Sequence, residues 1–275
     1  MLSAKDVIAR NPEIRVKDLR MLIAKVKELS YGKVAFDADS VYLNDEEFEL
    51  FQQLLARYRN DEPISKILNS KGFWKYDFYV NEDVLDPRPE TELIIETVLK
   101  QFDVTEKLNF LDIGAGSGCI LLSLLGEFKN SVGTGIDISE KAIAVARKNQ
   151  QRLNIKNANF ENVSWNDFAP STQFDVIVSN PPYIRTADIP SLDKNVREYD
   201  PLLALDGGET GLQPYQEITS LAKNWLKPNG IIVFEVGYNQ AQDVRKILES
   251  NEYNSVQIAK DLAGIERVVC GRLYS

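Results

Sequence analysis

Short apolar segments alternate with helical segments from residue 109 to the end of the chain. The apolar segments predict strands at 110–113, 132–137, 158–163, 174–178, 231–236, 255–259 and 267–273. Helices are predicted after the first two strands, up to residues 127 and 153, and again at 214–226 and 240–249, where apolar residues recur at helical spacing. This alternation predicts an α/β fold with a mainly parallel, doubly wound sheet. The last two strands have no helix between them and predict an antiparallel edge hairpin.

The first 75 residues follow a different pattern. Apolar residues such as Leu19, Leu22 and Val26 recur at three- and four-residue steps, which predicts a small all-α domain at 1–75. Asn44 or Asp45 is the expected start of its last long helix. Residues 76–86 contain aromatic and β-forming residues around a turn at 81–83, and predict a β-hairpin linker to a catalytic domain at 87–275. We expect the helical domain to recognise a macromolecular substrate.

Composition excludes several classes of site and partner. The net charge of −9 is spread along the chain, so direct binding to nucleic acid is not expected. There is no histidine, and the two cysteines, Cys119 and Cys270, match no metal or disulfide spacing, so both are expected in the core with no metal site. Neither a signal peptide nor a membrane-spanning run is visible. We therefore expect a cytoplasmic monomer with no membrane partner.

The fourth predicted strand ends abruptly in Asn180-Pro181-Pro182-Tyr183. Proline has no N–H for a sheet ladder and a fixed φ, so the strand cannot continue. An amide, two rigid carbonyls and a phenol ring therefore follow the carboxyl end of a buried strand. In an open α/β sheet, this is the edge where ligands bind.

The first predicted strand runs into a glycine-rich turn. Gly114, Ala115, Gly116, Ser117 and Gly118 follow Asp112 and precede a helix, an arrangement that lets a ligand approach the backbone and the helix N-terminus. The third glycine is Gly118, whereas the dinucleotide fingerprint requires it at Cys119. Asp137, at the end of the second strand, is spaced to bind the ribose of a nucleoside cofactor. Alternatively, it caps the helix that begins near Ser139.

Together these features resemble the class I methyltransferases that use S-adenosylmethionine and carry an Asn-Pro-Pro-Tyr motif. The resemblance implies a Rossmann-like, seven-stranded sheet and methylation of a planar nitrogen. Such a nitrogen is a poor nucleophile until acceptors hold its hydrogens. The Asn180 oxygen and the Pro181 carbonyl would be these acceptors, and Tyr183 would stack on the planar group, so we expect Asn180, Pro181 and Tyr183 to be catalytic. No strong base is required, because the product loses its proton after transfer.

A narrower resemblance covers most of the chain. The segment Arg88-Pro89-Glu90-Thr91-Glu92 resembles the active-site loop of the peptide chain release factor N5-glutamine methyltransferases, the HemK/PrmC family. This resemblance implies transfer of methyl from S-adenosylmethionine, giving S-adenosylhomocysteine, to the glutamine of a Gly-Gly-Gln loop in release factors. It implies cofactor contacts from Gly114, Ala115, Gly116, Ser117, Gly118, Asp137, Trp165 and Asn180. The implied substrate-binding residues are Asn180, Pro181, Pro182, Tyr183, Arg88, Glu90 and Thr91.

The sequence departs from the family at two places, and two other substrates remain open. Trp165 lies where some members have a tryptophan against the adenine, although a one-residue gap would give that contact to Asp167 instead; we favour Trp165. Asp200 stands where the family usually has glutamate. The alternative substrates are a glutamine in a ribosomal protein and an amino group of adenine or guanine in nucleic acid. A non-catalytic adaptor or a dinucleotide oxidoreductase fits the motifs less well.

Overall fold

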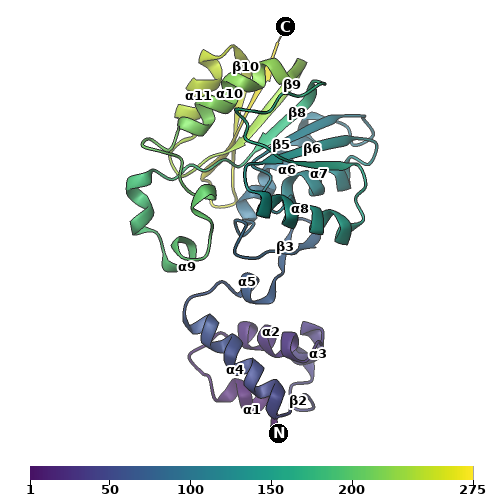
Figure 1. The fold of residues 1–275 in the computed structure, drawn as a ribbon, viewed down its shortest axis with the longest axis vertical. Helices are drawn as coiled ribbons and strands as arrows, with labels where there is room; N and C mark the ends of the chain where they lie inside the picture. Colours follow the sequence, from purple (N-terminus) through teal and green to yellow (C-terminus); the bar gives the residue numbers. More distant parts are fainter. Residues whose placement is uncertain (275) are drawn as a thin grey trace. The chain divides into compact units, whose positions relative to one another are not determined.

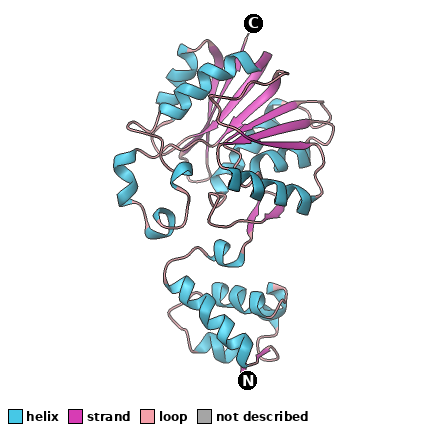
Figure 2. Ribbon diagram, viewed as in Figure 1, coloured by secondary structure: helices cyan, strands magenta, loops and turns pink. Residues whose placement is uncertain are grey.

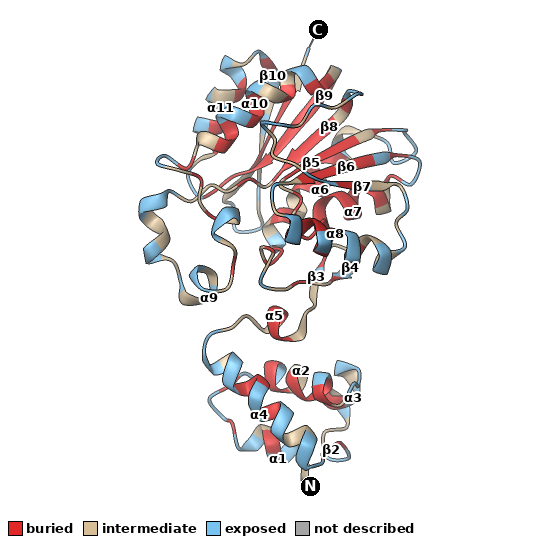
Figure 3. Ribbon diagram, viewed as in Figure 1, coloured by how far each residue is buried: buried red, intermediate tan, exposed pale blue. Residues whose placement is uncertain are grey.

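The computed structural model describes residues 1–274, and the chain divides into two compact units, Met1–Ser70 and Lys71–Ser275 (Figure 1). The first boundary falls five residues before the predicted end of the helical domain at residue 75. Each unit has its own core of buried apolar side chains (Figure 3).

The first unit is helical, apart from one short strand pair. Its helices are α1 (Ala4–Ala9), α2 (Val16–Val26), α3 (Tyr31–Phe36), α4 (Asp45–Arg59) and α5 (Ile64–Leu68), and the strands β1 (Leu2–Ser3) and β2 (Tyr42–Leu43) pair antiparallel. Asn44 is the N-cap of α4: its side chain accepts the Glu47 N–H at 2.8 Å, and the Glu47 carboxylate accepts the Asn44 N–H at 2.8 Å. This capping box confirms the predicted start of the helix.

The hairpin after the first unit lies earlier than predicted. It pairs β3 (Lys71–Phe73) with β4 (Tyr76–Phe78), so the prediction of a hairpin at 76–86 was wrong. The Asn81 side-chain oxygen accepts the Asp83 N–H at 3.2 Å and holds the turn at 81–83. Val80 and Val84 on either side of that turn are buried with Ala142 and Val145 of a later helix. Residues 79–86 therefore pack against that helix and do not form the predicted strand after the turn.

The second unit contains the predicted seven-stranded sheet. Its strands are β5 (Asn109–Ile113), β6 (Val132–Asp137), β7 (Ala158–Asn162), β8 (Phe174–Ser179), β9 (Leu226–Glu235), β10 (Tyr253–Lys260) and β11 (Glu266–Leu273). Their order is β10-β11-β9-β8-β5-β6-β7. Strands β7, β6, β5, β8 and β9 run parallel, whereas β11 pairs antiparallel with both β9 and β10. The fold class and the antiparallel edge hairpin are thus confirmed.

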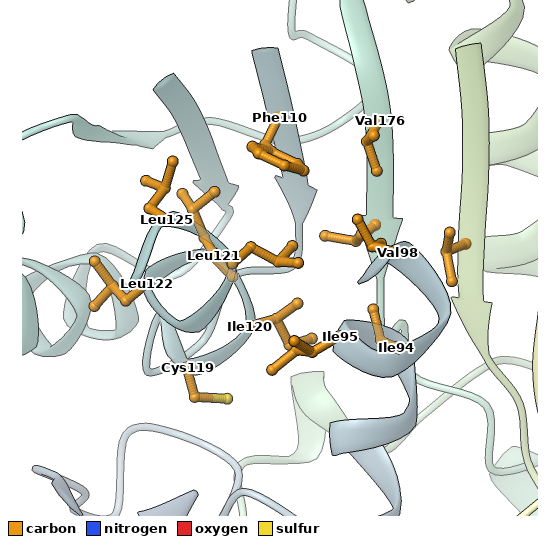
Figure 4. Packing of buried hydrophobic residues seen from close by; sticks show 14 of the residues in the cluster. Ile94, Ile95, Val98, Phe110, Cys119, Ile120, Leu121, Leu122, Leu125 and Val176 are labelled. Carbon is orange, nitrogen blue, oxygen red and sulfur yellow. The ribbon is translucent and has the colours of Figure 1, made fainter. Parts of the chain in front are cut away.

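Helices cover both faces of this sheet (Figure 2). The longer ones are α6 (Glu92–Gln101), α7 (Cys119–Glu127), α8 (Glu140–Leu153), α10 (Gln213–Trp225) and α11 (Ala241–Ser250). Because strand side chains alternate, Phe110 points to the core beneath α6, α7 and α8, whereas Leu111 joins the core beneath α10 and α11. Figure 4 shows the first of these cores, where Ile95 of α6 lies beside Ile120 of α7, and Phe110 and Val176 extend from the strands of the sheet. Cys119 and Cys270 are buried in the same core, and burial raises the pKa of both thiols to about 12.

Strand β5 lies at the point where the order of strands reverses. The chain proceeds from β5 to β6 and β7 on one side, and then returns to β8 on the other side of β5. The carboxyl ends of β5, β6, β8 and β9 therefore meet at one edge of the sheet, where α/β proteins bind ligands. The segment after β8 adds the short helices η2 (Thr186–Ser191), α9 (Lys194–Arg197) and η3 (Leu202–Ala204).

Gly118→Ala should destabilise the second unit more than Gly264→Ala does. Both glycines have positive φ, at 77° and 81° respectively. A Cβ at Gly118 would lie 2.9 Å from the Phe160 ring, whereas one at Gly264 would meet nothing within 4 Å. We expect Gly264→Ala to lower the free energy of unfolding by about 1 kcal/mol, and Gly118→Ala by about 1–3 kcal/mol more. Urea unfolding followed by tryptophan fluorescence would measure this, since all three tryptophans lie beyond Ser70. Equal losses would contradict the packing argument.

Candidate active site

The glycine-rich turn between β5 and α7 adopts left-handed backbone conformations. Gly114, Gly116 and Gly118 have φ values of 74°, 54° and 77°. A Cβ at Gly114 would have open space around it, whereas Gly118 packs against Phe160 of β7. The turn is held to the next strand, because the Gly114 and Ala115 N–H groups donate to the Ile136 carbonyl at 2.9 and 3.0 Å. The glycines therefore hold a rigid turn with room for a ligand beside Gly114.

Asp137 connects this turn to the start of α8. Its half-buried carboxylate accepts the Gly116 N–H at 2.9 Å through Oδ2 and the Ser139 N–H at 2.9 Å through Oδ1. Burial raises the pKa of Asp137, and these two hydrogen bonds oppose the rise. The N-cap of α8 is Ser139, whose hydroxyl accepts the Ala142 N–H at 3.2 Å. The alternative of Asp137 as the helix cap was therefore wrong, and its carboxylate retains lone pairs for ligand hydroxyls.

Asp112 is a buried acid to which we assigned no role from the sequence. Its Oδ2 accepts the Leu121 N–H at 3.3 Å, while its Oδ1 is buried without a hydrogen-bond partner among residues 1–274. Burial raises the pKa of Asp112 to about 7. The signal available in the sequence was an acid in a largely apolar strand, two residues before Gly114.

The Asn-Pro-Pro-Tyr segment is held firmly after β8. The Asn180 Nδ2 group donates to the Thr91 hydroxyl at 3.4 Å, and the Tyr183 carbonyl accepts the Gln240 Nε2 group at 3.0 Å. A Cβ at Gly207 would lie 2.8 Å from Tyr183 Cα, so the backbone of the following segment packs directly on this turn. Burial raises the pKa of Tyr183 to about 12, which keeps its phenol neutral.

The loop from Arg88 to Glu92 is fixed by a buried acid far along the chain. Arg88 Nη2 donates to Asp200 Oδ2 at 2.8 Å, and the Asp86 N–H donates to Asp200 Oδ1 at 3.3 Å. The Asp200 side chain is fully buried. Aspartate in place of the family's glutamate therefore still pairs with Arg88.

A cavity of about 280 Å³ joins this loop to the Asn-Pro-Pro-Tyr segment. Its lining comprises Leu85, Arg88, Glu90, Asn180, Tyr183, Ile184, Leu192, Val196, Ala204, Leu205, Glu235 and Arg267. Four of the predicted site residues, Arg88, Glu90, Asn180 and Tyr183, thus face one space. Thr91 lies beside it through its contact with Asn180. Glu235 and Arg267 are lining residues to which we assigned no role from the sequence, because they lie at the end of β9 and near the start of β11, strands whose order only the fold reveals.

Trp165 is not among the residues that line that cavity. Its indole N–H donates to Glu217 Oε2 at 2.9 Å. The segment before it is tied to β6, since the Asn162 side chain donates to the carbonyls of Asp137 and Ile138 at 3.0 and 2.8 Å. Ile138, which we did not predict, is an apolar side chain 58% exposed beside Asp137. The contact of Trp165 with the cofactor remains a prediction.

Among residues 1–274, no group of three or more His, Cys, Asp or Glu side chains is placed to hold a metal ion. None of the described helices has the length and apolar character that a membrane span requires.

Comparison with known proteins identifies the family. The family described as "Methyltransferase domain" matches residues 104–271. The release factor glutamine methyltransferase of Rhodospirillum rubrum is 40% identical over 257 residues, which cover 93% of this chain and 78% of that protein. The chain belongs to the release factor glutamine methyltransferase family. A member from Caulobacter vibrioides is 42% identical over 230 residues, covering 83% of this chain and 80% of its own length.

Solved structures agree with the fold of this family member. A methyltransferase from Pyrococcus furiosus superposes with a TM-score of 0.54 at 19% identity, over 82% of this chain and 100% of its own. The Thermus thermophilus 16S rRNA N2 G1207 methyltransferase superposes with a TM-score of 0.53 at 17% identity, over 74% of this chain and 49% of its own. At these identities the likeness shows the fold alone.

Proposed function

We propose that this chain transfers a methyl group from S-adenosylmethionine to the side-chain amide nitrogen (N5) of the glutamine in the Gly-Gly-Gln loop of peptide chain release factors. The observation that carries the proposal is the single cavity in which Asn180 and Tyr183 face Arg88 and Glu90. The names of the relatives support the same substrate. The ribosomal-protein and nucleic-acid alternatives are not favoured.

The glycine-rich turn and the end of β6 fit the methyl donor. The open space at Gly114 suits the methionine part of S-adenosylmethionine. Asp137 would accept hydrogen bonds from the ribose hydroxyls, and Ile138 with Trp165 would contact the adenine. When bound, S-adenosylmethionine supplies an electrophilic methyl group on a sulfonium.

Asn180 and Pro181 would hold the glutamine amide for attack. The Asn180 Nδ2 group donates to Thr91, so its Oδ1 is left to accept an N–H from the substrate, and the Pro181 carbonyl can accept the other. Held this way, the nitrogen lone pair is less delocalised into the amide and becomes nucleophilic. The neutral Tyr183 ring would stack on the planar group and keep the nitrogen in line with the methyl. The methylated nitrogen then loses its extra proton.

The rim of the cavity would receive the loop that carries the glutamine. Arg88 is fixed by Asp200 and is 35% exposed at its side chain, so its remaining N–H donors can bind backbone carbonyls of the substrate. The glycines beside the glutamine would let that loop approach closely. Glu90 and Thr91 would bind it from the same side, and Pro182 would keep the far wall rigid.

Labelled S-adenosylmethionine would test the proposal with four separate acceptors: a purified release factor, ribosomal protein, RNA and DNA. We expect label in the release factor alone, and a mass gain of one methyl group on the peptide that contains the Gly-Gly-Gln glutamine. A release factor in which that glutamine is replaced by alanine is the control and should remain unlabelled. Label in ribosomal protein or nucleic acid, or in none of the four, would overturn the proposal.

Met1–Ser70 is the part that we infer to recognise the release factor, in keeping with the helical domain predicted at 1–75. This unit contains a groove of about 690 Å³ lined by aromatic, apolar and arginine side chains, among them Phe48, Phe51, Arg10 and Arg59. Its role, the cytoplasmic location and the monomeric state remain predictions.

A further inference from the structure

Glu235 is a buried acid in the cavity that the proposed mechanism leaves without a role. It ends β9, is 3% exposed, and its Oε2 has no hydrogen-bond partner in the described part of the chain. The two nearest cations are already paired: Arg267 bonds Asp261 at 3.2 Å, and Arg88 bonds Asp200 at 2.8 Å. A carboxylate in this position needs stabilisation from neutral donors, because burial disfavours its charge.

The neutral donors beside it are Asn180, which lines the same cavity as Glu235, and Thr91, which is bonded to Asn180. Ser179 is paired with Phe234 in the parallel ladder, so Asn180, which follows β8, lies beside Glu235, the last residue of β9. Burial raises the pKa of Glu235 to about 7, while hydrogen bonding from the Thr91 hydroxyl, the charge of Arg267 and hydrogen bonding from Asn180 all oppose the rise; the charge of Glu90 adds to it.

The hydrogen bonds have one consistent direction. The Thr91 oxygen accepts from the Asn180 Nδ2 group at 3.4 Å, so the Thr91 hydrogen is free to point to the Glu235 carboxylate. An ionised carboxylate can only accept, a hydroxyl can do both, and the amide donates through nitrogen alone. While Glu235 is ionised, the donors would therefore run from Asn180 to Thr91 to Glu235.

The direction matters because an asparagine amide can rotate by half a turn and exchange its oxygen for its NH₂ group. The substrate amide needs an acceptor at that place, and an NH₂ group there would repel its N–H. An acceptor behind Asn180 stabilises the orientation in which the nitrogen points to Thr91 and the oxygen points to the substrate.

We propose that Glu235 and Thr91 are positioning residues that hold the Asn180 amide with its oxygen toward the substrate nitrogen. The inference rests on the proposed function in one respect, namely that the substrate group is an N–H donor. Glu235 does not need to touch the substrate for this role, and Thr91 fulfils it through Asn180, separately from its predicted contact with the substrate loop.

Glu235→Gln should lower kcat by about 10- to 100-fold, because the new amide can donate and so permits the reversed orientation of Asn180. The KM for release factor and the Kd for S-adenosylmethionine should stay within about twofold, since binding contacts are retained. Glu249→Gln, an exposed substitution on α11, is the matched control and should leave all three constants unchanged. A loss that appears only in KM or Kd, or an unchanged kcat, would overturn the proposal.

Thr91→Val removes the hydroxyl between the other two groups and should give a similar loss of kcat, while Thr91→Ser should restore activity. The double variant Thr91→Val/Glu235→Gln should lose no more kcat than either single variant, because both substitutions act on the same Asn180 amide. Multiplied losses would mean independent roles and would contradict the proposal.

A titration by carbon NMR of the Glu235 carboxyl tests the same contact without any activity. Thr91→Val should raise the pKa of Glu235 above that in the unsubstituted protein, because a donor to the charged form is lost. Glu90, Arg267, Arg88 and Tyr183, the other titratable groups facing this site, are unchanged in the comparison. Thr97→Val is the control, since the Thr97 hydroxyl donates to the Leu93 carbonyl instead. An unshifted pKa would refute the contact even if the protein methylates release factor, whereas failure of the unsubstituted protein to methylate would refute only the proposed function.

Discussion

Asn180→Ala should lower the rate of methyl transfer by about 100- to 1000-fold while S-adenosylmethionine still binds with nearly unchanged affinity. Alanine removes the acceptor that we propose for one substrate N–H. The Pro181 carbonyl alone cannot hold both hydrogens, so the nitrogen lone pair stays delocalised in the amide. Single-turnover rates with saturating release factor measure the transfer step directly.

Asn159→Ala is the matched control for Asn180→Ala. Asn159 lies on β7, and its side chain bonds Glu161 on the same strand at 2.7 Å, outside the cavity. The rate of methyl transfer and the cofactor affinity of the Asn159→Ala variant should equal those of the unsubstituted protein. If calorimetry on Asn180→Ala showed a loss of cofactor affinity as large as the loss of rate, Asn180 would be a cofactor ligand and not the acceptor for the substrate.

Asp137→Ala should have the opposite effect and weaken binding of S-adenosylmethionine by about 10- to 100-fold, the range expected for lost hydrogen bonds to a charged group. Two effects combine in this variant. The ribose hydroxyls would lose their acceptor, and the N–H groups of Gly116 and Ser139 would lose the carboxylate that ties the glycine-rich turn to α8. At saturating cofactor, kcat should approach that of the unsubstituted protein.

Calorimetry with S-adenosylmethionine and with S-adenosylhomocysteine measures the effect of Asp137→Ala. Asp243→Ala is the control, because Asp243 is an acid on α11 whose partner, Lys246, lies on the same helix. An unchanged dissociation constant for Asp137→Ala would remove Asp137 from the cofactor site.

Local patterns predicted most of the fold. The strands before α7 and α8 and the closing hairpin were recognised because the spacing of apolar residues reports which face of an element is buried. The capping box at Asn44 and Glu47 was recognisable for the same reason, since all its hydrogen bonds lie within four residues. The hairpin at 76–86 was misplaced because Val80 and Val84 pack against α8. That helix lies some sixty residues later in the chain, so local sequence patterns could not reveal the contact.

The amino-acid sequence alone was enough to locate the chemistry of this protein. Proline ends a strand wherever it occurs, and glycine permits positive φ wherever it occurs, so Asn180 to Tyr183 and Gly114 to Gly118 could be recognised without a structure. The partners of those groups could be found only in the folded chain. Arg88 meets Asp200 across 112 positions of sequence, and Asn180 meets Thr91 across 89. Contacts of this kind depend on the order of strands in the sheet, which brings together the ends of β8 and β9 and the loop before α6. For that reason the neighbours of Glu235 in the cavity are decided by tertiary structure.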